Sequence, residues 1–594
     1  MILRTTTLLA TGVSFIASGA LAADALSIRD LAPEGALLVV GVDDLPGTIS
    51  RLGPTALGKL WNDPSIAEEV KAIREGFTDG LREAAAEAGV AEDDIAWPTS
   101  LGAAVVVDIS EDTGLPTVDF MFFLDWADEA EKASKFLGTM IELAEKESKE
   151  DGGEVRMEEI RGRKVLVMTQ PEAEETLDED DFGGFDDEFG MMGLGLPDLE
   201  EPELSMTVDG GRLFVASNPL AMDLLLSRVD GDRAKAVGDS AAFQEAVALS
   251  GGTQDLYAVL STEAAQPIFG LMPQLMLVEP LVKQVFGDIK AWSFGAHAKD
   301  GVLEQCAGIY MPNGKSGLLS LVDESTEPAA PPAIVPSDAL SYGRLNLRFD
   351  RILEVLDGIL GGMPAEQSEM VGPMLDMYRP AMRGAFAALG PAVHVWSGEP
   401  DAEDPLASTT VTAISMKGDK DSAAAVSDLL NLFGLGLDAR DFNGMTILSD
   451  ELSPFAVGIG GGYLVLGSTL DVEAALRAVD SKDAGLAADE DFAKAFATMP
   501  KDPVVGMAAW DIVRQMTSTM RMLDGLEGQL GGMAGLDEEF EVPGLGAGVP
   551  SADALTDLLK EDAVKRCFGP ATLSFTSTGK GFATTYRWLP AAGE

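Results

Sequence analysis

Cysteine and histidine are scarce in this sequence of 594 residues, which holds two of each. The two cysteines, Cys306 and Cys567, are too few for a disulfide scaffold and leave open one bridge or two buried thiols. The two histidines, His297 and His394, lie in strand-like segments without a partner motif, which favours structural roles. The chain has no G-x-S-x-G elbow and no H-E-x-x-H motif, so we expect no catalytic, cofactor-binding or metal-binding residue.

Basic residues are also few, with 42 Lys and Arg against 98 Asp and Glu and a formal charge of −56. Nucleic acid and anionic lipid surfaces are therefore poor partners, because both are repelled over many charges. The charge favours solubility first, and it leaves binding of divalent cations or of a basic partner as alternatives. Aromatic residues make up 6% of the chain, which gives little sign of a sugar-stacking site.

The first 22 residues have the order of a secretory signal peptide. A basic start, MILR, precedes a charge-free run to Leu21 that ends in Ala20-Leu21-Ala22. Cleavage is expected between Ala22 and Ala23. The run holds too many threonines, serines and glycines for a membrane anchor, which needs about 20 strongly apolar residues. We therefore expect an exported protein, periplasmic or extracellular, with no transmembrane segment in the mature chain.

The sequence contains an internal repeat. Four segments of the first half recur in the same order in the second half, and the pairs are 33–37 with 336–340, 159–166 with 441–448, 210–217 with 461–468, and 293–312 with 574–590. Self-similarity of this kind predicts a repeated architecture. We expect one repeat over residues 28–322, a second over 336–592, and a Pro-rich linker between them at 323–335.

The spacing between equivalent positions changes at two low-complexity tracts, which we interpret as insertions. The first, 172–203, is acidic and has no basic residue, and the second, 524–550, is rich in Gly and Met. Such tracts bury too little apolar surface to offset their ordering entropy, so both predict mobile loops. Asp178 and Asp180 open a calcium-loop pattern, but Phe189 stands where that pattern needs a carboxylate. The pattern favours a solvated acidic loop, with calcium binding as the alternative.

Strands joined by hairpins dominate the periodic patterns. The segments 159–166 and 441–448 each predict a strand, a Gly turn and a returning strand. The uncharged stretch Ser453–Leu470 is broken by glycines and predicts two buried strands. Val118–Leu124 predicts a strand that leads into a helix reaching Lys149. The sequence therefore favours the α+β class, with two tandem related domains, each a largely antiparallel or mixed sheet with packed helices.

Short sequence patterns also predict two turns and the start of one helix. Gly210-Gly211 and Gly461-Gly462 precede strands, so we expect turns there rather than phosphate cradles. Asp63-Pro64 predicts the start of a helix whose apolar side begins with Ile66 and Val70.

Methionines cluster in three stretches, which are 272–276, 363–382 and 507–522. Flexible thioether side chains suit adaptable binding surfaces for apolar partners. Methionines at helical spacing are more often core residues, however. The sequence favours the core interpretation and keeps a binding surface as the alternative.

The Pro-x-x-Ala-Leu start after a signal peptide, the Gly-Gly-x-Leu strand and the repeated strand and helix units resemble those of large exported bacterial proteins grouped as a domain of unknown function. The resemblance covers most of the mature chain and implies a tandem-duplicated α/β unit with no assigned activity, so no site residue follows from it. We expect a non-enzymatic binding or structural module of the cell envelope or periplasm, whose partner is a protein or an apolar ligand. The alternatives are an extracytoplasmic hydrolase that uses carboxylates and an acidic protein that binds divalent cations.

Overall fold

A computed structural model describes residues 26–591, with gaps at 69, 72–97, 110–115, 127–129, 151, 170–202, 254, 268–281, 323–324, 364, 400–409, 419, 433–436, 451–454, 480, 482–484 and 518–560. The predicted cleavage site between Ala22 and Ala23 lies outside the described residues. So do nearly all of the acidic tract 172–203 and the whole of the tract 524–550. The export, insertion and calcium hypotheses for these segments stay predictions.

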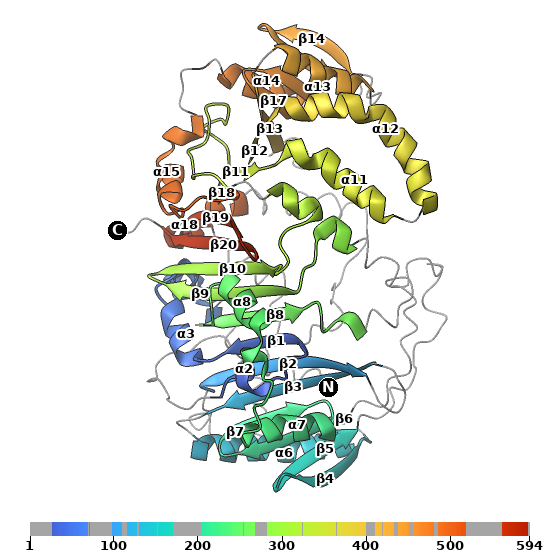
Figure 1. Ribbon diagram of the computed structural model, residues 1–594. Helices are drawn as coiled ribbons and strands as arrows, with labels where there is room; N and C mark the ends of the chain where they lie inside the picture. The colour runs from blue at the N-terminus through green and yellow to red at the C-terminus, as the bar shows by residue number, and fades with distance from the viewer. Residues whose placement is uncertain are drawn as a thin grey trace, which may run out of the picture. The chain divides into compact units, whose positions relative to one another are not determined.

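The chain is α+β, as the hairpin pattern predicts. The described residues contain 20 strands in antiparallel pairs. Helices pack on the strands of each unit (Figure 1). Two compact units divide the chain. Unit 1 comprises Met1–Ser50, Arg74–Leu277 and Lys290–Gly295. The rest forms unit 2, which thereby includes the early segment Arg51–Ile73 and the segment Val278–Ile289.

The strands of unit 1 pair in the order β4, β5, β6, β7, β3, β2, β1 and β8. Their bounds are β1 (Ala36–Val42), β2 (Ser100–Ile109), β3 (Pro116–Asp125), β4 (Glu154–Ile160), β5 (Arg163–Thr169), β6 (Glu203–Asp209), β7 (Arg212–Ala216) and β8 (Leu256–Ser261), and β9 (Ala291–Lys299) begins in this unit. The helices are α2 (Ile28–Leu31), α3 (Leu45–Leu52), α6 (Ala130–Glu150), α7 (Pro219–Val229) and α8 (Ala241–Leu249).

Helix α2 lies on one face of this sheet because two strand positions carry glycine. A Cβ on Gly41 would lie 2.5 Å from the Tyr257 hydroxyl, and one on Gly102 would lie 2.5 Å from the Cβ of Ile28. Ile28 and Leu31 are fully buried. The glycines therefore make the space that the short helix fills.

Helix α6 covers part of the opposite face of unit 1. Phe136 and Leu137 of α6 pack with Val42, Leu101 and Leu124, which project from three neighbouring strands. The predicted strand Val118–Leu124 and the helix reaching Lys149 are thus confirmed as β3 and α6.

The strands of unit 2 pair in the order β14, β15, β16, β17, β13, β12, β11, β18, β19, β20 and β10. Their bounds are β10 (Val302–Tyr310), β11 (Ser341–Asn346), β12 (Leu389–Ser397), β13 (Thr410–Met416), β14 (Asp438–Phe442), β15 (Met445–Ser449), β16 (Phe455–Gly460), β17 (Tyr463–Ser468), β18 (Gly506–Trp510), β19 (Phe568–Thr578) and β20 (Gly581–Pro590). The helices are α4 (Ala56–Trp61), α11 (Ile352–Gly362), α12 (Ala365–Ala388), α13 (Lys420–Leu432), α14 (Thr469–Val479), α15 (Glu490–Ala497) and α18 (Glu561–Cys567).

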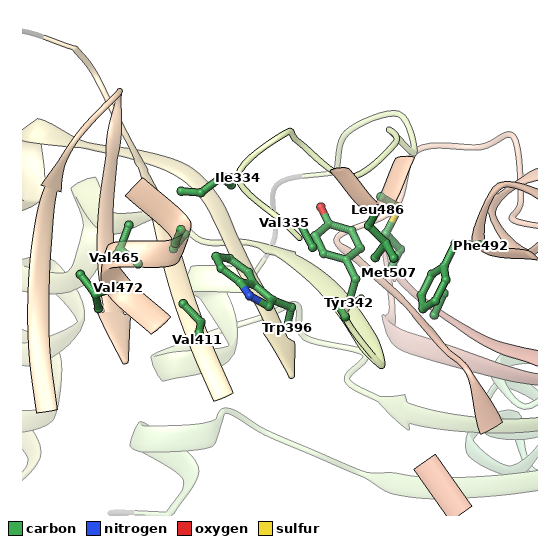
Figure 2. Close-up of a cluster of buried hydrophobic side chains, with 14 of the residues drawn as sticks. Ile334, Val335, Tyr342, Trp396, Val411, Val465, Val472, Leu486, Phe492 and Met507 are labelled. Atoms are coloured by element: carbon green, nitrogen blue, oxygen red, sulfur yellow. The ribbon is translucent and has the colours of Figure 1, made fainter. Parts of the chain in front are cut away.

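The main core of unit 2 gathers around Tyr342 and Trp396 (Figure 2). Ile334 and Val335, which end the predicted linker, are buried in this core. Thr326, near the start of the linker segment, forms a β-bridge with Val504. Parts of the segment 323–335 therefore pack against the sheet that follows it.

The early segment 51–73 packs against the C-terminal helix α18. Ala56, Leu60 and Ile66 form one buried cluster with residues of α18. Asp63 begins the 3₁₀ turn Pro64–Ile66, as its cap pattern predicts, and accepts a hydrogen bond from the backbone of Ser65 at 2.9 Å.

The carboxylate of Asp63 also binds the C-terminal end of unit 2. Its two oxygens accept hydrogen bonds from Arg566 at 3.1 and 2.8 Å. The guanidinium lowers the pKa of the nearly buried Asp63 well below its usual range, against the opposing effect of burial. This ion pair ties together residues that are 503 positions apart.

The predicted hairpin turns are confirmed. Both residues of 161–162 and of 443–444 have positive φ, as two-residue turns of type I′ require. The same holds for 210–211 and 461–462, which join β6 to β7 and β16 to β17. The stretch 453–470 forms the two strands β16 and β17, as expected. No helix in the described part of the chain is both long and apolar enough to span a membrane.

Replacement of Gly102 by valine is expected to destabilise the protein. The new side chain would collide with Ile28 and with Phe123, whose ring lies 2.7 Å from an ideal Cβ, at a cost of about 2 kcal/mol or more in the free energy of unfolding. Gly138→Ala in α6 is the control, since its Cβ meets nothing within 4 Å and a helical alanine stabilises by about 0.5–1 kcal/mol. Urea unfolding of both variants measures the difference. Equal stabilities would contradict the packing of α2.

Candidate functional site

Both histidines are buried strand residues, His297 in β9 and His394 in β12. The hydroxyl of Tyr342 lies 2.9 Å from Nδ1 of His394, and the two rings stack. Tyr463 meets the His394 ring edge to face. Burial, reinforced by the nearby charge of Arg344, lowers the pKa of His394 to about 4. A neutral, enclosed imidazole of this kind serves packing rather than proton transfer at neutral pH.

A polar cluster beside His394 fixes the segment that precedes β11. The hydroxyl of Thr326 accepts hydrogen bonds from Arg344 at 3.0 Å and from Asn346 at 2.9 Å. Asn346 also donates to the backbone carbonyl of Val504 at 3.3 Å. Arg344 and Asn346 are two positions apart in β11, so their side chains project on the same side of the sheet. The cluster holds Thr326 against the strand.

Unit 1 has its own polar cluster, centred on Asp43 at the end of β1. Ser27 donates to Asp43 at 2.7 Å, Tyr257 donates to it at 3.2 Å, and Arg29 forms an ion pair with it at 2.8 Å. Burial first, and the charge of Asp43 second, raise the pKa of the Tyr257 hydroxyl above its usual range. Both carboxylate oxygens of Asp43 are engaged, so the cluster anchors α2 instead of offering a free base.

Asp125, at the end of β3, also holds the chain near α2 in place. Its carboxylate is fully buried and accepts hydrogen bonds from the backbone of Leu26 at 2.9 Å and from Arg212 at 3.3 Å. A buried carboxylate needs such partners to offset its desolvation. Asp125 therefore fixes the residues that lead into α2.

Both cysteines are free, buried thiols in the structure, so the alternative of two buried thiols holds and a bridge does not. Cys306 lies in β10, where its Sγ is 3.8 Å from the hydroxyl of Thr585. Cys567 ends α18. Burial raises the pKa of both thiols, which keeps them protonated and poorly nucleophilic.

The described residues hold no group of three or more His, Cys, Asp or Glu side chains arranged to bind a metal ion. The calcium pattern at Asp178, Asp180 and Phe189 lies outside the described part of the chain. The glycine pairs at 210–211 and 461–462 form hairpin turns between strands, and Gly211 packs against Ala130, the first residue of α6.

The methionines of the stretch 363–382 divide into buried and exposed groups. Met382 is buried, which confirms the core interpretation there. Met370, Met374 and Met377 are instead 74%, 57% and 64% exposed, so the core interpretation is wrong for them. Residues spaced i, i+4 and i+7 lie on one side of a helix. The three form one exposed apolar stripe along α12, which we name the methionine face.

The surroundings of the methionine face are acidic. Glu369 and Asp376 are exposed on the same helix. The nearest arginine, Arg379, is already paired with Asp357 of α11 at 2.7 Å and with Asp376 at 3.0 Å. Helix α12, drawn in yellow in Figure 1, carries the methionine face, and the ion pair of Arg379 with Asp357 joins it to α11. The arrangement offers flexible apolar contacts beside negative charge.

The sequence singled out the methionines but missed the polar clusters around Asp43 and Arg344. Glycines within strands are a signal for close approach of another group. Gly41 and Gly102 meet that description, and Tyr257 and Ile28 are the groups that approach them. The partners themselves are too distant along the chain to be read from local patterns.

The buried His394 predicts a pH dependence of stability. The pKa of His394 is about 4 in the folded state and 6.5 in the unfolded state. The neutral imidazole therefore contributes fully to the stability of the fold above pH 6.5, and this contribution is lost as the pH falls toward 4. The free energy of unfolding falls by about 3 kcal/mol over this range. Urea unfolding of the protein and of His394→Gln between pH 7 and 4 measures it. The variant is expected to show the weaker pH dependence, and equal slopes would contradict the assignment.

Comparisons with known proteins found no match: no protein-family model, no curated protein and no solved structure matches the chain. The functional argument therefore rests on the chain's own residues.

Proposed function

We propose that the chain is an exported, non-enzymatic binding module of the cell envelope or periplasm, and that its methionine face recognises an apolar surface on another protein. The exposure of Met370, Met374 and Met377 is the observation that carries this proposal. Large apolar side chains gathered on one exposed helix side mark interaction surfaces. The flexible thioether chains adapt to the shape of a partner.

The charge around the face indicates the chemistry of the partner. Glu369 and Asp376 flank the stripe, and the whole chain carries a charge of −56. An apolar surface with a basic border would gain from both features, because opposite charges steer encounter and fix orientation. The partner that fits is an amphipathic helix with leucine-like residues on one side and Lys or Arg beside them.

The order of the strand pairings in the two halves of the chain supports a module built from a repeated domain. The pairings β1 with β2, β2 with β3, β3 with β7 and β1 with β8 recur as β11 with β12, β12 with β13, β13 with β17 and β11 with β18. Both halves also carry hairpins at equivalent places, β4 with β5 and β14 with β15. This order supports our proposal that the chain is a tandem duplication of one α+β domain, exported after removal of residues 1–22.

A designed helical peptide of leucine and lysine, with leucine at helical spacing i, i+3, i+4 and i+7, tests the methionine face. We expect it to bind the mature protein in a fluorescence anisotropy titration. Replacement of Met370, Met374 and Met377 together by serine is expected to weaken binding by about 1,000-fold or more, since each buried methionine contributes on the order of 1.5 kcal/mol.

The matched control is Leu470→Ser, which removes another apolar side chain of unit 2 that is 78% exposed. It should leave the affinity of the peptide unchanged. Circular dichroism verifies that both variants stay folded. Equal affinity of the triple variant and the parent protein would refute the methionine face as the binding surface.

A further inference from the structure

The exposed methionines of α12 offer sulfur atoms as well as apolar surface. Met370, Met374 and Met377 are 74%, 57% and 64% exposed. The sulfur of a thioether is a soft ligand for metal ions, in contrast to the hard oxygen of a carboxylate. Three soft donors on one side of a helix therefore have the chemistry of a metal site.

The spacing of the three residues brings their sulfur atoms within reach of one another. At about 3.6 residues per turn, positions i, i+4 and i+7 fall within about 60° of the helix circumference. Met374 and Met377 are separated by about 4.5 Å along the helix axis, and Met370 and Met374 by about 6 Å. Each side chain has three rotatable bonds, so neighbouring sulfur atoms can turn toward one ion. Met374 lies between the other two and can share an ion with either neighbour.

The other soft ligands in the described part of the chain are enclosed or isolated. Both cysteines are buried free thiols, and both histidines are buried strand residues. Burial raises the pKa of both thiols and so opposes formation of the thiolate that binds metal ions. Among the described methionines, the remaining one that is more than half exposed is Met157 of β4, which belongs to unit 1. The methionine face is thus the group of soft donors that this part of the chain presents to solvent.

The charge near the methionine face favours a cation. Glu369 is exposed beside Met370. The guanidinium of Arg379 is paired with Asp357 at 2.7 Å and with Asp376 at 3.0 Å, which offsets its positive charge. The chain as a whole carries a charge of −56. This field attracts positive ions of every kind, so the sulfur atoms decide which ion is held.

The donor set selects a soft ion. Thioether ligands suit Cu(I), whereas Ca²⁺ and Mg²⁺ take oxygen ligands. Zinc takes thiolate, imidazole and carboxylate ligands. A thioether also binds without losing a proton, unlike a thiol or an imidazolium. Binding by thioether ligands alone is therefore insensitive to pH near neutrality.

We infer that Met370, Met374 and Met377 form a binding site for Cu(I). The sequence motifs that indicate a metal site consist of Cys, His and carboxylates, so thioether ligands at helical spacing escape them. Binding of Cu(I) depends on sulfur rather than on apolar surface. It therefore stands apart from the partner helix proposed above, although the same three side chains serve both.

Replacement of all three methionines by leucine tests the sulfur atoms, since leucine keeps the apolar volume and the helix preference. Cu(I) is supplied to the mature protein without oxygen, with ascorbate as reductant, bicinchoninate as the competing chelator and calcium to occupy carboxylates. The parent protein is expected to hold one more equivalent of Cu(I) than this variant. The affinity for that equivalent should change by less than about twofold between about pH 6 and 8.

Met157→Leu is the matched control, because it removes an exposed methionine that lies outside the face. It should hold as much Cu(I) as the parent. Met374→Leu should weaken the affinity of the site by about tenfold or more, and more than Met370→Leu or Met377→Leu does, since Met374 has a neighbour on both sides. Circular dichroism verifies that the variants stay folded.

Methyl NMR of labelled methionine with Ag(I), a soft ion of the same charge, locates the site. The methyl signals of Met370, Met374 and Met377 should shift at lower Ag(I) concentration than that of Met157. The inference is wrong if the triple leucine variant holds as much Cu(I) as the parent, if Met157→Leu loses the same equivalent, or if the Met157 signal shifts as early as the other three.

The leucine and serine variants separate Cu(I) binding from peptide binding. The triple leucine variant should bind the leucine and lysine peptide more tightly than the triple serine variant does, while both lose the equivalent of Cu(I). A parent protein that binds Cu(I) at the face but not the peptide would refute the proposed function alone. One that binds the peptide but holds no more Cu(I) than the leucine variant would refute the metal site alone.

Discussion

The architecture depends on the pairing of its central strands on both edges. Strand β1 lies between β2 and β8, and β11 lies between β12 and β18. Both edges of such strands are hydrogen-bonded, so other elements can pack only on the two faces of the sheet. The side chains project alternately to these two faces. In unit 1, one face accepts α2 where Gly41 and Gly102 remove side chains. The other face is covered by α6 over part of its area, where Phe136 and Leu137 pack on the sheet.

The charged groups in the interior serve to fix segments of the chain. Asp43 holds Arg29 and Tyr257, and Asp63 holds Arg566. Each carboxylate is surrounded by donors, which offsets the cost of removing its charge from water. The interior carboxylates thus attach α2 to the sheet and the segment 51–73 to α18.

Local chemistry made part of the fold predictable. The turn at 443–444, the cap at Asp63 and the strands within 453–470 depend on residues close in sequence, and each was confirmed. The position of the segment 51–73 in unit 2 depends on an ion pair between residues 503 positions apart, which no local pattern reveals. Periodicity also places Met370 and Met382 on one helix without telling which faces solvent, because that depends on what packs nearby.

The exposure of the methionine face is the central claim of this account, and oxidation by dilute hydrogen peroxide tests it most directly. The mature protein is treated under native conditions, and mass spectrometry of its peptides gives the rate of sulfoxide formation at each methionine. The account predicts that Met370, Met374 and Met377 oxidise much faster than the buried Met121 and Met222. Oxidation of the three at the slow rate of Met222 would show that the face is covered in the native protein and would contradict the account.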